Sequence, residues 1–342
     1  MFSARRLPSR GLAAFALVTG GTGFVWAMVV YGLYAGAGFD WLRVPFLPLS
    51  VMGIAVSFYG GFKNNASYDR FWEGRKIWGA IVNESRSWAS GVLCYVRPGD
   101  ESDEARAVRR ELVYRHLAWI NALRLQLRRE SRFFDNPARG TAKRLAAHAT
   151  HMRNDWDAEL APFLPADELT ATSAMVNPAT HLVHRHGAEL ADLFRTQKTD
   201  LFHQIALMGI LRELYTLQGK CERIKKTPFP RQYAEFSRIF TRVFVYLVPF
   251  GLLDVFADHL PAGIPTAANL PWLLPYFAAS TMIAWVFLTM DGIGDASEDP
   301  FERSMNDVPM NALCRVIERD LRQLLGETEL PPAEQPIDGI LY

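Results

Sequence analysis

The chain has 342 residues and a net charge of only +1, from 37 Lys and Arg residues against 36 Asp and Glu residues. This balance gives no indication of nucleic-acid binding, which relies on a strongly basic surface. The mean hydropathy is near zero, as in many soluble proteins, but the average hides long uncharged segments. The three cysteines, Cys94, Cys221 and Cys314, are scattered, and they predict neither a disulfide framework nor a Cys-based metal site.

Four segments are predicted to cross a membrane as helices, because a crossing needs about 20 mostly apolar residues. Three of them are long and uncharged. The weakest segment, residues 243–253, has 11 uncharged residues before Asp254, so a buried soluble helix is its alternative. Pro249 within it would kink a membrane helix without excluding one. The predicted membrane helices are residues 11–37, 44–63, 238–258 and 271–291.

The second of these helices is predicted to continue beyond the membrane. The stretch SFYGGFKNNASYDRFWEGRKIWG, residues 57–79, passes from apolar residues into amide, charged and aromatic ones. No proline and no glycine pair interrupts the join after Phe62. One long helix that leaves the membrane near residue 63 and runs on in water to about residue 95 accounts for this pattern.

The basic residues predict the orientation in the membrane. Of all Lys and Arg residues, only Arg43 lies in the two predicted outer loops, residues 37–45 and 258–270. Because cytoplasmic loops are enriched in Lys and Arg, both termini are predicted to be cytoplasmic. A signal peptide is disfavoured as the alternative for the first segment, since its uncharged stretch exceeds the 7–15 residues typical of such peptides.

The remainder of the chain is predicted to be a water-facing helical region, formed by residues 64–237 and a C-terminal tail, residues 292–342. Residues 103–130 and 199–226 carry apolar residues at helical spacing. Loop signals concentrate within residues 134–180, for example DNPARGTAKR at 135–144. Strand-like alternation is nowhere sustained, so the sequence predicts an all-α protein.

Few residues suggest chemistry. The sequence HLVHRH places His181 and His184 at a spacing that can bind a metal ion, but a solvated or hydrogen-bonded histidine cluster is the favoured interpretation. No nucleophile–base pattern or phosphate-binding loop occurs, so we predict no enzyme, no catalytic residue and no cofactor. TGGTGF, residues 19–24, lacks the rest of a dinucleotide-binding motif, and its glycines indicate close helix packing.

Carboxylates cluster just after the last predicted membrane helix. Oxygen ligands grouped in this way can hold calcium, but their spacing is not that of an EF-hand. Helix capping and ion pairs with basic residues are the favoured interpretation, and no metal site is predicted. The cluster consists of Asp291, Asp295, Glu298, Asp299 and Glu302.

The second predicted membrane helix carries two stripes at intervals of four residues, so each stripe lies on one helix face. One stripe is bulky and apolar, and taken alone such a stripe is more typical of a core than of a pore. The other stripe consists of small residues, which let helices pack closely in lipid. The bulky stripe is Ile54, Phe58 and Phe62, and the small stripe is Gly53, Ser57 and Gly61.

Three separated segments resemble motifs of the bestrophin family, in particular of its bacterial members. They occur in the family's order, and the likeness covers essentially the whole chain. The resemblance implies one bestrophin-like channel domain over residues 1–342, which forms a homopentamer around a central five-fold pore in the cell inner (plasma) membrane. The segments are GIAVSFYGGFKNNASYDRFWEGRKIWG (53–79), GKCERIKKTPFP (219–230) and EDPFERSMNDVPMNALC (298–314).

The resemblance also implies where small monovalent ions pass. The bulky stripe would line a narrow hydrophobic neck, and Asn64 and Asn65 would meet the ion at the neck exit. A cytoplasmic vestibule would end in a second apolar constriction at Ile205, with Leu201 as the alternative position. Selectivity between cations and anions stays open. Ion pairs between subunits are expected from Lys63, Asp69, Arg70, Glu73 and Arg75.

Animal bestrophins carry a calcium clasp with a run of aspartates after the last membrane helix. This chain has no such run there, so we expect a calcium-independent channel. Two other classes of function remain. A membrane transporter or carrier usually shows inverted repeats around a midplane site, which the sequence lacks. A membrane scaffold would bind a cytosolic partner through residues 97–195.

Overall fold

The computed structural model describes Met1 and residues 9–129, 150–260, 266–302 and 306–342. Within these ranges every regular element is a helix, apart from one isolated bridge between Ile337 and Ile340. The all-α prediction is therefore confirmed. The predicted loop signal at residues 135–144 and part of the predicted outer loop 258–270 lie outside the described residues.

The chain divides into two compact units. We call the first the membrane unit; it contains Ala4–Asp69 and Phe229–Glu298. The second, which we call the bundle unit, contains Met1–Ser3, Arg70–Pro228 and Asp299–Tyr342. The helix α2 supplies residues to both units, because it runs without interruption over 50 residues. The predicted long helix is therefore present, and it ends at the predicted position.

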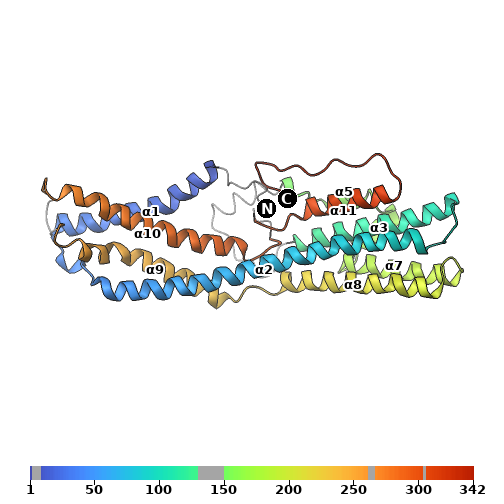
Figure 1. The fold of residues 1–342 in the computed structure, drawn as a ribbon, viewed down its shortest axis with the longest axis horizontal. Helices are drawn as coiled ribbons and strands as arrows, with labels where there is room; N and C mark the ends of the chain where they lie inside the picture. Colours follow the sequence, from blue (N-terminus) through green and yellow to red (C-terminus); the bar gives the residue numbers. More distant parts are fainter. Residues whose placement is uncertain (2–8, 130–149, 261–265, 303–305) are drawn as a thin grey trace. The chain divides into compact units, whose positions relative to one another are not determined.

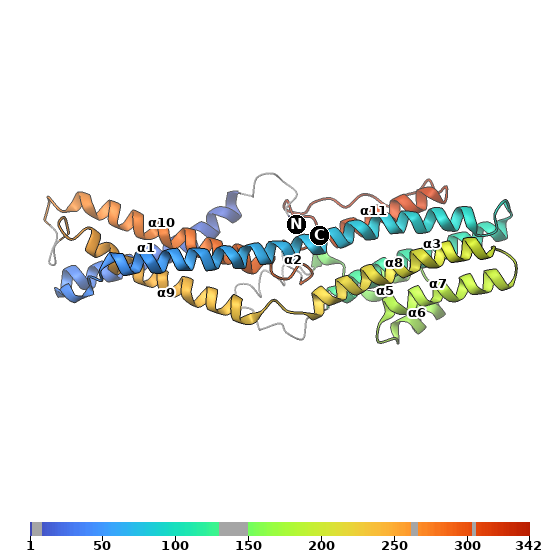
Figure 2. The ribbon, with the colours of Figure 1, turned by 60° about the horizontal axis from the view of Figure 1, so that its bottom comes forward.

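The membrane unit contains four helices that are long and apolar enough to cross a membrane. They correspond to the four predicted membrane helices, including the weakest one, which stays helical through Pro249. Figures 1 and 2 show α1 alongside α10. Apolar side chains such as Leu17 and Val25 are exposed on α1, as expected for a surface that meets lipid. The helices are α1 (Ser9–Ala37), α2 (Phe46–Tyr95), α9 (Arg231–Val255) and α10 (Leu270–Ser297), with a short 3-10 helix η1 (Asp40–Leu42).

The bundle unit packs the later part of α2 against helices from the middle and the end of the chain (Figures 1 and 2). The fully buried indoles of Trp78, Trp88 and Trp119 are the largest side chains in its core. The two predicted helices, at 103–130 and 199–226, are both present. The elements are α3 (Asp103–Leu127), η2 (Thr150–Met152), α5 (Trp156–Leu160), α6 (Ala166–Ser173), α7 (Pro178–Arg195), α8 (Leu201–Lys226) and α11 (Met310–Leu324).

Side-chain caps explain where the bundle helices begin. The Ser102 side chain accepts a hydrogen bond from the backbone N–H of Ala105 at 3.2 Å, and the Asp200 carboxylate accepts one from His203 at 2.9 Å. Such caps satisfy backbone donors that the first helical turn leaves unpaired. They fix the starting residues of α3 and α8, and hence the direction in which each later side chain of these helices points.

A buried polar network joins α3 to α11. The Asn311 Oδ1 atom accepts hydrogen bonds from Arg124 at 2.7 Å and from Arg128 at 2.6 Å. Arg124, which is fully buried, also donates to a Glu159 carboxylate oxygen at 2.5 Å. A buried charge needs such partners to offset the loss of water. The C-terminal tail therefore contains a helix that belongs to the core of the bundle unit.

The glycines of TGGTGF allow α1 to pack closely against α10. A Cβ atom added at Gly23 would lie 2.5 Å from the Cβ atom of Ala284, and one added at Gly20 would lie 3.6 Å from Thr281. A Cβ atom at Gly21 would meet nothing within 4 Å. Two of the three glycines therefore face the neighbouring helix, in the way that small residues permit close approach in membranes.

A buried lysine fixes α2 within the membrane unit. The Lys63 ammonium lies 2.9 Å from a carboxylate oxygen of Asp291 and 2.5 Å from one of Asp295, both on α10. Arg238 of α9 approaches Asp295 at 3.4 Å. Lys63 is only 2% exposed, so the two carboxylates replace the water that its charge has lost. This group links three helices at the residue that directly follows the bulky stripe of α2.

We expect Gly23→Ala to destabilise the membrane unit, whereas Gly21→Ala should not. The Ala284 Cβ atom is attached to the α10 backbone, so a methyl group at position 23 forces the two helices apart. Overpacking of this kind typically costs about 1–3 kcal/mol. Thermal unfolding of the purified variants in detergent measures the difference. Equal midpoints for the two variants would contradict the close approach of α1 and α10.

We expect Lys63→Met to lower the stability by about 3 kcal/mol, because removal of one partner leaves buried carboxylates without compensation. Lys63→Arg, which keeps the charge, should lose much less. Lys76→Met is the matched control, since Lys76 pairs with Glu73 at the surface, where such pairs contribute about 0–1 kcal/mol. Thermal unfolding of the purified variants in detergent again measures the stability. An equal loss of stability in the Lys63→Met and Lys76→Met variants would refute the anchoring role of Lys63.

Candidate functional site

The bulky stripe of α2 has no cover within its own chain. Ile54, Phe58 and Phe62 are 71%, 69% and 59% exposed, and none of them belongs to the core of the membrane unit. The rings of Phe58 and Phe62 meet edge to face, with centroids 4.7 Å apart. The core interpretation of this stripe is therefore wrong for the subunit itself. Its assignment as a pore neck stays a prediction.

The small stripe is divided between two environments. A Cβ atom added at Gly53 would lie 2.7 Å from the ring of Phe244 on α9, so this glycine lies at a close contact inside the unit. Ser57 donates a hydrogen bond to the Gly53 carbonyl at 2.8 Å. A Cβ atom at Gly61, or at neighbouring Gly60, would meet nothing within 4 Å. The half of the stripe nearer Lys63 therefore leaves room for another helix to approach.

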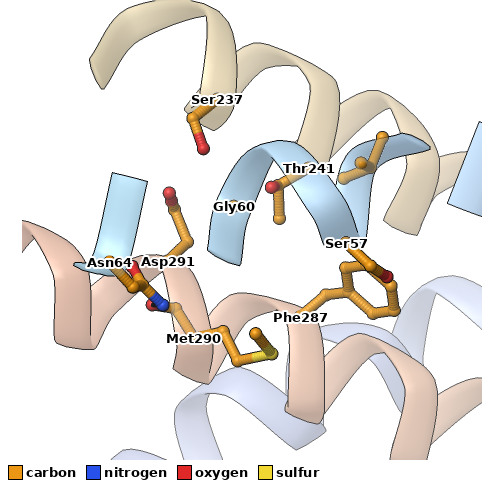
Figure 3. A pocket seen from close by; sticks show the side chains of 9 residues that line it. Ser57, Gly60, Asn64, Ser237, Thr241, Phe287, Met290 and Asp291 are labelled. Atoms are coloured by element: carbon orange, nitrogen blue, oxygen red, sulfur yellow. Dashed lines mark hydrogen bonds between the residues drawn. The ribbon is translucent and has the colours of Figure 1, made fainter. Parts of the chain in front are cut away.

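A small cavity lined by both apolar and polar residues lies behind the bulky stripe, between α2, α9 and α10. Its volume is about 10 Å³, close to the smallest space that holds one water molecule. Figure 3 shows the polar ends of Ser237, Thr241 and Asp291 around it. Ser237 and Thr241 are almost fully buried. The back of α2 therefore meets polar groups, while its front is apolar.

The two asparagines at the expected neck exit differ in direction. The Asn64 Nδ2 atom donates a hydrogen bond to the Met290 carbonyl at 3.0 Å, so this side chain turns toward α10. A Cβ atom at Gly294 would collide with the Asn64 Oδ1 atom, at 2.2 Å. Asn65 is exposed. Of the two, Asn65 is the one whose side chain is free to meet an ion.

The candidates for the second constriction lie at the start of α8 in the bundle unit. Ile205 is 60% exposed and Leu201 is 51% exposed, and the structure leaves both as candidates. Phe202, which spacing along the chain did not single out, is more exposed than either. The sequence shows three apolar residues within the five positions that follow Asp200, and this grouping could have identified Phe202 as a further candidate for the constriction.

The carboxylates of the acidic cluster, which lie in the last turns of α10 and just after it, form ion pairs with basic side chains. Glu298 pairs with Arg231 at 3.4 Å, Asp299 pairs with Arg70 at 3.3 Å, and Glu302 pairs with Lys225. Asp291 and Asp295 hold Lys63, as described above. The structure thus agrees with the favoured interpretation of ion pairing.

Three of the charged residues expected to pair between subunits pair within the chain instead. Lys63 binds Asp291 and Asp295, and Glu73 lies 3.4 Å from Lys76. Arg70 also donates hydrogen bonds at 2.6 Å to the carbonyl oxygens of Ile224 and Thr227, near the end of α8. The partners of Lys63 and Arg70 are remote in sequence, whereas Glu73 pairs with a residue one helical turn away. Pairing between subunits stays a prediction. Asp69 and Arg75 have no ion pair among the described residues.

The histidines of HLVHRH do not form one cluster. His184 is exposed, whereas His186 is fully buried, with its ring 4.6 Å from Trp88 and 6.2 Å from His116. Neither ring nitrogen of His186 has a hydrogen-bond partner in the part of the chain that the structure describes. Burial lowers the pKa of His186 well below its usual value and lowers the pKa of His116 to about 3. Both rings are therefore neutral at physiological pH, and the interpretation as a solvated or satisfied cluster does not hold for His186.

Comparison with known proteins places the chain in a family. Residues 18–323 match the model described as "Bacterial/Fungal Bestrophin protein". The chain is 30% identical to a voltage-dependent anion channel-forming protein of Ralstonia nicotianae, over 83% of this chain and 78% of that protein. It is 29% identical to one of Mesorhizobium japonicum, over 86% of this chain and 79% of that protein.

A solved structure agrees with this result. The crystal structure of a bacterial bestrophin homologue from Klebsiella pneumoniae matches with a TM-score of 0.72 and 26% identity, over 93% of this chain and 100% of that chain. The likeness extends over both units and includes the four candidate membrane helices. The chain therefore belongs to the bacterial and fungal bestrophins, a family of channel-forming multi-pass membrane proteins and not of enzymes.

Proposed function

We propose that the chain is the subunit of a homopentameric channel for small monovalent ions in the cell inner membrane, with both termini cytoplasmic. The observation that carries the proposal is the bulky stripe of α2, which is apolar, aromatic and without cover in its own chain. Five copies around an axis would enclose these side chains in a narrow tube. An apolar constriction of that kind controls ion passage by losing and regaining its water.

Lipid is the competing cover for an exposed apolar stripe in a membrane helix. The open space at Gly60 and Gly61 favours another protein helix, because small residues let helix backbones approach closely. The buried group around Lys63 supports the same reading, since it fixes α2 from the side opposite the stripe. A helix held in this way can present its front to a neighbouring subunit in a defined orientation.

The ions are proposed to be anions on the strength of the relatives, which are described as voltage-dependent anion channel-forming proteins. In the bundle unit, Ile205 or Leu201 would form a second apolar constriction, and Phe202 is a third candidate for that position. Asn65 would help to rehydrate the ion at the exit of the neck. Membrane lipid surrounds the assembly, and no nucleic acid takes part.

Reconstitution into liposomes tests the function directly. The purified protein should conduct chloride salts as unitary currents, and its mass in mild detergent should be that of five subunits. A monodisperse monomer would refute the assembly. Saturable exchange with fixed stoichiometry would indicate a carrier, and the absence of flux would indicate a scaffold that binds a partner through residues 97–195.

We expect Phe58→Ala to increase the unitary conductance or the open probability, because loss of the ring widens the middle of the neck and lowers the barrier to wetting. Discrimination between ions of different size should fall. The stability of the subunit should change little, since Phe58 makes no part of its core. Unitary currents and thermal midpoints are measured on the same preparation.

The control for this variant is Leu17→Ala, which truncates an equally exposed apolar side chain on α1. It should leave conductance and selectivity unchanged. If Phe58→Ala conducts like the wild type, or if it unfolds about 3–5 kcal/mol more easily, as loss of a buried aromatic side chain would cause, the neck assignment of Phe58 is wrong.

We expect currents to be the same with calcium present and with a strong chelator. The carboxylates Glu298, Asp299 and Glu302, which follow α10, already bind basic side chains, so a calcium ion would have to displace these partners. Currents from one bilayer are recorded before and after chelation. A loss of several-fold on chelation would show that these carboxylates form a calcium site after all.

A further inference from the structure

The helix α8 has one face in the core of the bundle unit and the opposite face uncovered. Successive residues of a helix are rotated by about 100°, so the direction of each side chain can be compared with that of Ile205. The buried side chains point away from Ile205, and among them are Leu207, Leu211, Leu214, Leu217 and Cys221. The face centred on Ile205 is therefore free to meet solvent, an ion or another subunit.

This Ile205 face is apolar at its start and basic along the rest of its length. Arg223 points in the same direction as Ile205, and Arg212 and Lys220 lie within about 60° of it. No Asp or Glu of α8 lies in this sector. Glu213 lies outside the sector, and Glu222 turns away to accept hydrogen bonds from Gln218 and Asn177, both at 2.8 Å.

The three basic side chains have no ion pair within the described residues, since no carboxylate oxygen lies within 4.0 Å of Arg212, Lys220 or Arg223. This distinguishes them from many other basic side chains of the bundle unit, for example Arg86 with Asp320 at 2.6 Å and Arg115 with Glu168 at 2.6 Å. These three positive charges, which share a face with an exposed apolar residue, are therefore available to interact with anions from outside the chain.

We propose that Arg212, Lys220 and Arg223 line the ion pathway on the same face of α8 as the apolar constriction, about 10 to 27 Å further along the helix, and bias the channel toward anions. The inference rests on the proposed function, because the Ile205 face must point toward the pore. Repeated around the axis, these charges would create a positive potential that raises the local anion concentration and lowers that of cations. The apolar residues would set the width of the pathway, and the basic ones would set the sign of the ions that enter it.

Acidic groups beside this face act against the bias. Glu84 of α2 lies close enough to Glu213 for their charges to interact; burial, and then this neighbour, raise the pKa of the Glu84 carboxyl. A substitution at Glu213 therefore tests the proposal in the opposite direction from substitutions of the basic side chains. Its neutralisation should strengthen the preference for anions, whereas neutralisation of the basic side chains should weaken it.

The test uses the full-length protein in planar bilayers under a potassium chloride gradient, where the reversal potential gives the anion-to-cation permeability ratio. The triple variant Arg212→Gln, Lys220→Gln, Arg223→Gln should lower this ratio by about threefold to tenfold at 0.05 M salt, in keeping with the size of electrostatic focusing in charged clefts. At 1 M salt, where the Debye length is about 3 Å, the variant and the wild type should converge.

Arg185→Gln is the matched control, because Arg185 is exposed on α7 and likewise has no ion pair among the described residues. It should leave the ratio unchanged, and Glu213→Gln should raise it. The single variants Arg212→Gln and Arg223→Gln should each show part of the effect, so the test survives if the triple variant fails to assemble.

A conducting triple variant with an unchanged ratio at low salt would overturn the proposal while leaving the channel function intact. The proposal is likewise overturned if the triple variant loses the pentamer and the single variants keep the wild-type ratio, because the basic side chains then serve subunit contacts. If the wild type itself carries no current, the proposed function fails, and the selectivity role of this face fails with it.

Discussion

The apolar front of α2 has no partner in its own chain, and the rest of the structure depends on this constraint. Three bulky side chains in one stripe stay exposed, as do Leu47 and Val51 earlier on the same helix, whereas Leu49 and Val56 are buried. Exposed apolar surface of this kind has to be covered by lipid or by protein. In the proposed pentamer, a ring of identical helices would cover this surface and at the same time enclose an apolar passage that water enters only when the passage is wetted.

The back of α2 explains why the front can keep a defined direction. Gly53 lets Phe244 of α9 approach the helix backbone, and Lys63 is held between two carboxylates of α10. These contacts lie immediately before and after the bulky stripe. A neck requires this combination, because side chains that face a pore cannot contribute packing energy to their own subunit. The stability of the helix must then come from the opposite face.

Helical periodicity made much of the fold predictable. Uncharged segments of membrane length located α1, α2, α9 and α10, and the absence of a turn signal after Phe62 predicted the continuous α2. The stripes of α2 followed from the same period. Contacts between residues far apart in sequence were not predictable: Lys63 was expected to pair between subunits, but it pairs with carboxylates more than 200 residues away.

The rest of the site was harder to predict, because the sequence does not show which side of a helix is buried. Spacing alone could not choose between Ile205 and Leu201, because both lie on the exposed side of α8, and it passed over Phe202. The sequence grouped His186 with other polar residues, but its side chain points into the core. The preceding residue, Arg185, points to the surface, because successive side chains of a helix differ in direction by about 100°. The sequence did not single out the basic residues Arg212, Lys220 and Arg223 of α8, because only the structure shows that they share a face with Ile205 and have no ion pair among the described residues.

Access to the neck from water tests the pore-lining role of α2 most directly. Phe58→Cys is combined with Cys94→Ser, since Cys94 is the exposed native cysteine while Cys221 and Cys314 are buried. A charged, membrane-impermeant thiol reagent is added to the reconstituted channel during current recording. We expect the current to be blocked, and Leu17→Cys on α1 in the same background to be insensitive. Unaltered current in the Phe58 variant, with the thiol shown by mass to be unmodified, would contradict the claim that this face of α2 lines the pore.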